Sequence, residues 1–128
     1  MVSRFSDEKN RNQPNRARQV WLILVGKAMN RQTVTYKQLS ELMFGKTAAG
    51  VLDKILGHIA YYCEDNDLPQ LNAIVVNSKT GVPGDDIPLS SLDIHEVREK
   101  VYQENWYDII PPHADELKAA FKQASLGY

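Results

Sequence analysis

The sequence predicts a mainly α-helical α+β domain with a winged helix-turn-helix core and two additional C-terminal helices. Three helical patterns come first, one β-branched segment follows them, and two further helical patterns come last. The second and third patterns are short, and a turn that contains Gly45 joins them. The β-branched segment leads into the turn-forming residues 78–81. This order of elements is the one expected of a winged helix-turn-helix.

Length and composition indicate one globular domain. The chain has 128 residues, of which 43% are apolar and 24% charged, and this is the ordinary composition of a soluble protein. Residues 1–16 show no apolar periodicity, so we expect a flexible basic arm there and a single domain over 17–128. The helical extension of that domain covers about 90–126. Cys63 is the only cysteine and no apolar run is long enough for a membrane span, which favours a cytoplasmic protein.

Local signals position the first two helices. The first is expected over 17–29, where apolar residues recur at helical spacing. The second begins after Thr35, because Thr35 and Gln38 have the spacing of a capping box. Gly45 is expected to end it, since glycine readily adopts the left-handed conformation found after helices.

The third helix leads into the predicted wing. Thr47 is the expected N-cap of this helix, which runs to about Asp65. Residues 71–77 are rich in β-branched side chains and bounded by turn formers, so they predict a buried strand. Residues 78–81 then form a turn, and 82–88 return as a short edge strand or as a loop.

Two more helices are expected after the wing. The first begins at Ser90 or Ser91, and the second has Pro112 in its first turn. Between them, Trp106 and Tyr107 are expected to cover the core. The outer face of these helices is a candidate surface for a homodimer or a protein partner.

Three segments within residues 33–84 carry a family resemblance. They are Val34-Thr35-Tyr36-Lys37-Gln38-Leu39, Ala48-Ala49-Gly50-Val51-Leu52 and the stretch from Ala73 to Gly81. In this order they resemble the DNA-binding domain of the O6-alkylguanine-DNA alkyltransferases and the alkyltransferase-like proteins. The resemblance implies a winged helix that binds DNA.

The same comparison argues against alkyl transfer. The Pro-Cys-His-Arg motif of that family is absent, and Cys63 lies on the helix that precedes the expected strand. Since alkyl transfer needs an activated thiolate at that strand, no catalytic residue and no enzyme activity are expected. Residues 68–84 also resemble a set of small bacterial winged-helix proteins, which implies the same fold.

Charge is unevenly distributed along the chain. Residues 1–60 carry ten Lys and Arg against four Asp and Glu, whereas residues 61–128 carry five against twelve. A basic half and an acidic half suggest two faces with different partners. We expect a non-enzymatic, bacterial or phage-related protein that binds double-stranded DNA as a transcription regulator or as a factor that recognises DNA structure. The alternative is a protein-protein interaction module, such as an adaptor or an immunity or inhibitor protein.

The candidate DNA contacts follow from placing the third helix in the major groove. Expected phosphate contacts are Arg31, Thr35, Tyr36, Lys37, Lys46, Thr47 and Lys79. Expected base-facing positions are Ala48, Ala49, Gly50, Asp53 and Lys54. Alanine and glycine read only a thymine methyl group or the shape of the groove, so backbone or shape recognition is expected in place of sequence readout.

No metal site and no cofactor site are expected. His58, His95 and His113 have no metal-ligand spacing among themselves or with Cys63. His58 lies near the apolar stripe of the third helix and is expected to be a partly buried residue with satisfied hydrogen bonds. Cys63 occupies a core position and is expected to be inert.

Overall fold

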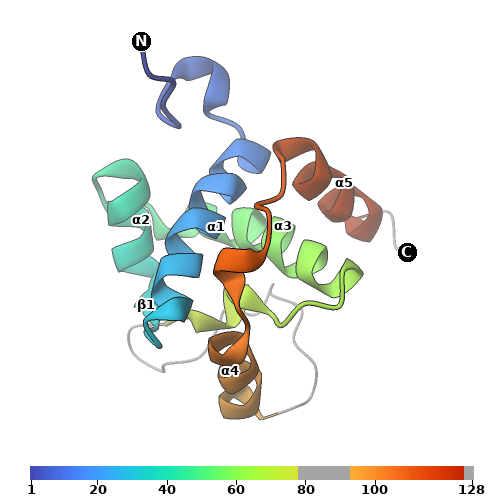
Figure 1. The fold of residues 1–128 in the computed structure, drawn as a ribbon. Coiled ribbons are helices and arrows are strands. Elements are labelled where there is room, and N and C mark those ends of the chain that lie inside the picture. Colours follow the sequence, from blue (N-terminus) through green and yellow to red (C-terminus); the bar gives the residue numbers. More distant parts are fainter. Residues whose placement is uncertain (78–92, 126–128) are drawn as a thin grey trace.

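The computed structural model describes residues 1–77 and 93–125, and in them the protein is mainly helical (Figure 1). Five α-helices and a two-stranded sheet lie in these residues. The helices are α1 (Gln13–Met29), α2 (Tyr36–Phe44), α3 (Leu52–Asp65), α4 (Ile94–Gln103) and α5 (Ala114–Ser125), and the strands are β1 (Val34–Thr35) and β2 (Val75–Val76). None of these helices is long and apolar enough to cross a membrane.

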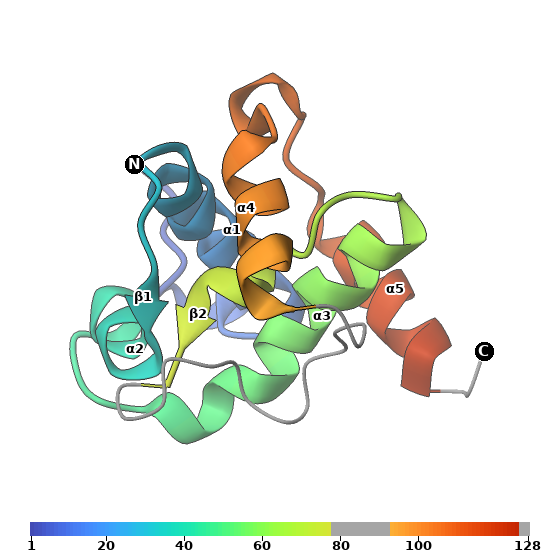
Figure 2. The same cartoon turned by 90° about the horizontal axis from the view of Figure 1, so that it is seen from below.

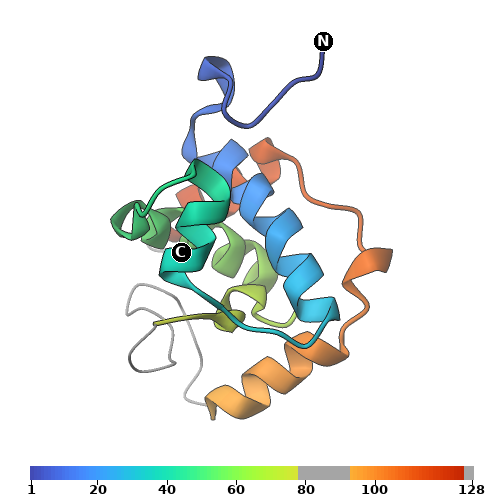
Figure 3. The same cartoon turned by 90° about the vertical axis from the view of Figure 1, so that its left-hand side faces the viewer.

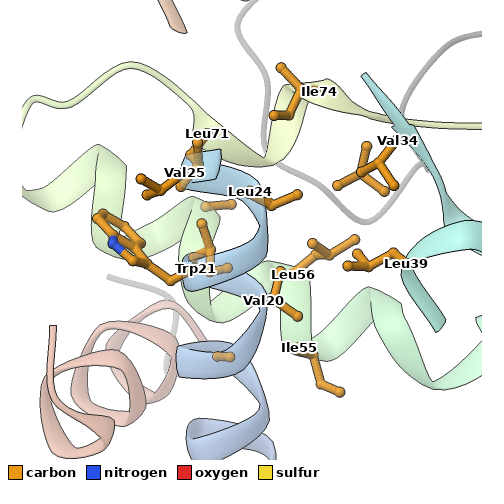
Figure 4. Close-up of a cluster of buried hydrophobic side chains, with 14 of the residues drawn as sticks. Val20, Trp21, Leu24, Val25, Val34, Leu39, Ile55, Leu56, Leu71 and Ile74 are labelled. Atoms are coloured by element: carbon orange, nitrogen blue, oxygen red, sulfur yellow. The ribbon is translucent and has the colours of Figure 1, made fainter. Parts of the chain in front are cut away.

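Helix α1 is the centre of the core. Its apolar face meets side chains from α2, α3, β1 and the 3-10 helix Leu71–Ile74 (Figure 4). Trp21 is almost completely buried, and its ring lies edge-on to Tyr62 and Trp106 at centroid distances of 5.7 and 5.6 Å. Trp106 therefore covers the core as predicted, whereas Tyr107 remains 67% exposed.

Helix α2 is bounded by the predicted signals. The Thr35 hydroxyl accepts a hydrogen bond from the Gln38 backbone N–H at 3.0 Å, and the Gln38 side chain accepts one from the Thr35 N–H at 3.1 Å. The capping box is thus confirmed. Gly45 follows the helix with φ at 73°, in the left-handed region that favours glycine.

Helix α3 begins later than predicted. A short 3-10 helix, Ala49–Val51, precedes it, and no side chain caps its first turn. Thr47 does not cap it; the Thr47 hydroxyl donates to Glu41 of α2 at 3.4 Å instead. The helix packs against both α1 and α5 (Figure 2), so most of its residues are buried.

The predicted strand over 71–77 is wrong for most of its length. Residues Leu71–Ile74 form a 3-10 helix with every residue buried, and only β2 is extended. Strand β2 pairs with β1 in parallel, with Val34 opposite Val75. A short apolar run does not distinguish a buried strand from a buried helical turn, which explains the error. In the described part of the chain no wing hairpin is present, and residues 78–92, with the expected turn, return strand and helix start, lie outside it.

The two C-terminal helices are present and take different positions. Helix α4 begins at Ile94, after Asp93, whose side chain accepts a hydrogen bond from the His95 N–H at 2.7 Å. Helix α5 begins at Ala114, two residues after the predicted Pro112, and packs on α3. Helix α4 lies at the opposite end of the molecule from the N-terminal arm (Figures 1 and 3).

The N-terminal arm is shorter and more structured than predicted. Helix α1 starts at Gln13, within the expected arm, with Asn12 as its N-cap and Pro14 in its first turn. A 3-10 helix, Glu8–Asn10, precedes it. Side-chain hydrogen bonds to the backbone, including Asn10 Nδ2 to the Arg4 carbonyl at 2.8 Å, fold the arm back on itself.

Candidate nucleic-acid interface

Two of the exposed lysines among the predicted contacts lie at the connection between α2 and α3, and a third lies at the opposite end of α2. We call residues 45–51 the α2–α3 turn. Lys37 lies in the first turn of α2, Lys46 in the α2–α3 turn, and Lys54 in the first turn of α3, and all three are exposed. Gly50 is exposed as well. Lys79 lies outside the described residues.

Three polar residues of the predicted set act in the fold. Thr35 caps α2, and Tyr36 is half-buried and packs against the hydrophobic core. Thr47 hydrogen-bonds to Glu41. A phosphate contact by the Thr47 hydroxyl therefore competes with an existing hydrogen bond, whereas the Thr35 hydroxyl accepts its bond and can still donate to a phosphate.

Arg31 is already engaged by a carboxylate. Its guanidinium makes two hydrogen bonds to Glu99 of α4, at 3.1 and 2.8 Å, and lies 5.5 Å from the centroid of the Tyr102 ring. The hydrogen bond from Arg31 lowers the pKa of the Glu99 carboxyl. The pair is an exposed bidentate salt bridge, which links the segment after α1 to α4. The predicted phosphate contact at Arg31 requires this salt bridge to break.

The middle of α3 is covered by α5. Gly57 and Tyr61 follow Lys54 at helical spacing on the same face of α3. Gly57 is buried, and a Cβ placed there would lie 3.0 Å from Cε1 of Phe121. Tyr61 is half-buried, with its ring centroid 6.3 Å from that of Phe121. On this face of α3, the exposed residue among Lys54, Gly57 and Tyr61 is Lys54, so the first turn is the part open to a long ligand such as a DNA duplex.

The arm lies beside the α2–α3 turn. One groove of about 300 Å³ is lined by Arg11 of the arm, Phe44 of α2 and Val51 of the turn. Arg16 lies in the same groove, largely buried, with its guanidinium 4.7 Å from the centroid of the Phe44 ring. Burial and the nearby Arg11 lower the pKa of Arg16. The groove brings cations of the arm next to the exposed turn.

The side-chain charges of α3 add to its backbone dipole, because its only lysine lies near the positive N-terminal end and acidic residues lie at the negative C-terminal end. Lys54 lies in the first turn, which also contains Asp53, while Glu64 and Asp65 lie in the last turn with no basic residue. Acidic residues at a helix C-terminus oppose the partial negative charge of the helix end and cost stability. The arrangement leaves the N-terminal end of α3 the more favourable end for an anion.

The sequence predicted a basic arm but not the cleft that its cations form with Arg18 of α1. Arg4, Lys9 and Arg18 line one cleft, although residues 1–16 were expected to be unstructured. The Asn12 cap and Pro14 are signals that the helix starts early and that the preceding residues are held near it. We call the space lined by residues 3–5, 9, 10, 15 and 18 the N-terminal cleft.

In the part of the chain that the structure describes, the histidines and the cysteine belong to no cluster of three or more metal-ligating side chains. His58 is buried, donates from Nδ1 to the Lys54 carbonyl at 2.7 Å and stacks on Phe121. Burial raises the pKa of the Cys63 thiol to about 12, so the reactive thiolate is scarce at neutral pH. Cys63 is part of the core, as predicted, and His58, at 2% exposed, is more deeply buried than predicted.

An apolar groove of about 380 Å³ runs between α1 and the segment that joins α4 to α5. Leu22, Val25 and Gly26 line its α1 side, and Tyr107 and Ile109 lie opposite. Leu22 is 65% exposed and Tyr107 67%. Exposed apolar surface of this kind is a common feature of protein contact sites.

Comparison with known proteins adds nothing to this geometry. No family model, curated protein or solved structure matches the chain.

Proposed function

We propose that this protein binds double-stranded DNA without enzymatic activity, through the α2–α3 turn and the adjoining arm. The observation that carries the proposal is the shared groove of Arg11, Phe44 and Val51. This groove supports a continuous cationic edge, because Lys46 lies in the exposed turn and Arg11 belongs to the neighbouring arm. A helix-turn-helix uses the start of its second helix in the same way.

The contacts on this edge suit the DNA backbone better than the bases. Lys37, Lys46 and Lys54 are exposed point charges on long side chains, which neutralise phosphates and carry no sequence information. Gly50 offers no hydrogen-bonding side chain, and Asp53 is repelled by phosphate. The proposed binding is therefore sensitive to salt and to DNA shape, and nearly indifferent to base sequence.

The test is the salt dependence of duplex affinity. Fluorescence anisotropy of a labelled duplex is measured over a salt series for the parent protein, K46Q and K54Q. Each substitution is expected to weaken binding and to reduce the slope of log affinity against log salt by about 0.9, the value for one lost phosphate contact on duplex DNA.

Two further variants make the test specific. K100Q removes an exposed lysine from α4, at the far end of the molecule, and is expected to leave the slope unchanged. R31Q is expected to change it little, because Glu99 already holds Arg31. Absence of duplex binding at low salt, or an equal loss in K46Q and K100Q, would contradict the proposal.

The apolar groove favours a protein partner as the second candidate function. Leu22 and Tyr107 line it and expose apolar surface, and Ile110, which lies between the lining residues Ile109 and Pro111 in the sequence, is 84% exposed. If the groove is a contact site, Y107S is expected to abolish self-association or partner binding and to leave the fold intact. Sedimentation of the parent and Y107S over a concentration series measures the first case. A concentration-independent monomer in both proteins would exclude a homodimer through this groove.

A further inference from the structure

The N-terminal cleft is a cavity lined by cations and carboxamides. It has a volume of about 320 Å³, at the lower end of the range for small-ligand sites. Arg4, Lys9 and Arg18 contribute positive charge, and Asn10 and Asn15 contribute amide groups. No carboxylate lines it.

The cleft is held open by the fold of the arm. The Asp7 carboxylate accepts a hydrogen bond from the Arg4 backbone N–H at 2.9 Å, and Asn10 Nδ2 donates to the Arg4 carbonyl at 2.8 Å. Arg11 Nε donates to the Ser6 carbonyl at 2.7 Å. These bonds fix the loop that carries Arg4 and Lys9, while Arg18 projects from α1, a rigid helix.

The cations of the cleft form no ion pair among the described residues. In residues 1–77 and 93–125 the structure pairs none of the Arg4, Lys9 and Arg18 side chains with a carboxylate. Three like charges around one cavity repel each other, and an anion placed between them relieves the repulsion. Arginine binds the oxygens of a phosphate in a two-pronged manner, and lysine binds them as a point charge.

Phe5 gives the cleft a second kind of surface. Its ring lines the same cavity and is half-buried, so one part of it stays accessible. An aromatic ring next to cations is the combination that holds an unpaired nucleotide, because the base stacks on the ring and the phosphate meets the cations. A simple phosphate or an acidic peptide would not use the ring in this way.

We propose that the N-terminal cleft binds an unpaired nucleotide, with its phosphate between Arg4, Lys9 and Arg18 and its base against Phe5. The inference extends the proposed DNA binding. Lys9 and Asn10 of the cleft directly precede Arg11 and Asn12 of the groove beside the α2–α3 turn. A nucleotide that projects from the end of a bound duplex therefore reaches the cleft, and the protein favours DNA ends or unpaired positions over a continuous duplex.

The experiment compares two duplexes that differ at one end. A labelled blunt duplex is measured beside the same duplex with a single 5′-phosphorylated unpaired nucleotide. The overhang is expected to raise the affinity of the parent protein at least about five-fold, the lower end of what stacking of one base supplies. R18Q and K9Q are expected to remove this gain, and F5L to reduce it while keeping apolar bulk. K100Q is the control that keeps the full gain.

A deoxynucleoside monophosphate added as competitor separates the two sources of the ligand. If millimolar competitor abolishes the gain, the cleft also takes free nucleotides; if the gain persists, the cleft recognises the strand end. Equal affinities for the two duplexes, together with no binding of the monophosphate by itself, would overturn the inference.

The failure of this inference is distinct from the failure of the proposed function. The protein could bind the blunt duplex with a salt slope that K46Q reduces and yet gain no affinity from the overhang. That result would support the proposed function and refute nucleotide binding in the cleft. The protein could instead bind only the duplex with the overhang, in a manner that depends on Arg18. That result would support nucleotide binding in the cleft and refute the α2–α3 turn as a DNA-binding site.

Discussion

His58 and Arg31 show how single residues depend on parts of the chain that are distant in sequence. His58 is buried because Phe121 of α5 stacks on its ring, with centroids 4.2 Å apart and planes within 5°. The backbone of Arg31 has a φ of 55°, which is uncommon for residues other than glycine. Its side chain is hydrogen-bonded to Glu99 of α4. No local sequence pattern indicates that Phe121 contacts His58 or that Glu99 contacts Arg31.

Acid is expected to destabilise the protein through His58. Burial lowers the pKa of His58 below its ordinary value of 6.5, so the unfolded chain takes up the proton first. The stabilisation is complete above about pH 6.5 and is lost as the pH falls toward the lowered pKa, with a slope of at most about 1.4 kcal/mol per pH unit. Urea unfolding at about pH 7.5 and about pH 5 measures the difference.

Two substitutions assign this pH dependence to His58. H58N is expected to be less stable than the parent at every pH, because the ring stack is lost, and to show a smaller difference between the two pH values. H95Q removes an exposed histidine and is expected to keep the difference of the parent. An H58N protein with the full difference would show that another group is responsible.

At the scale of elements, prediction succeeded where the signal is local. The Thr35 and Gln38 capping box and the glycine at position 45 lie within a few residues of the helix they bound, and both are confirmed. Thr47 has a good capping side chain but turns to Glu41, and Leu71–Ile74 form a 3-10 helix under the packing of α1 and α4. A competing hydrogen bond six residues away overrides the capping preference of Thr47, and tertiary contacts override the strand preference of residues 71–74.

The candidate site was predictable only in part for the same reason. The exposure of Lys46 follows from its place in the turn after Gly45, and that of Lys54 from the polar face of the third helix. The loss of Gly57 and Tyr61 from that face depends on where α5 packs, which no local pattern encodes. The N-terminal cleft depends on hydrogen bonds within a segment that has no apolar periodicity.

A pair of glycine substitutions tests the contact between α3 and α5. G26A is expected to raise the free energy of unfolding by about 0.5–1 kcal/mol, because alanine favours the helix and a Cβ at Gly26 meets nothing within 4 Å. G57A has the same helical gain but places Cβ 3.0 Å from Phe121, whose ring is held by His58. We expect G57A to be at least about 1 kcal/mol less stable than G26A. The free energies of unfolding of G26A, of G57A and of the double variant G57A/F121L, measured by denaturant unfolding, test this expectation.

The double variant is the control for that contact. If the Phe121 ring causes the cost, G57A is less damaging in the F121L background than in the parent. Equal stabilities of G26A and G57A would mean that α5 moves away without cost, and the middle of α3 would then be open to a ligand.

At the scale of the molecule, the basic and acidic halves of the sequence are only partly separated in space. The arm and the α2–α3 turn carry exposed cations at one end, and α4 carries Glu96 and Glu99 at the other (Figure 1). Arg31 belongs to the basic half but is neutralised by Glu99. The cationic surface is therefore smaller than the charge of residues 1–60 suggests, and it consists of the turn together with the arm.

The most direct measurement of where DNA binds is an amide NMR titration of the isotope-labelled protein with a short duplex. The proposal predicts progressive shifts for residues 46–54 and 4–18 and unchanged signals for α4, with the shifts reversed by added salt. Shifts confined to α4 or to the groove around Tyr107, or no shifts at low salt, would contradict it.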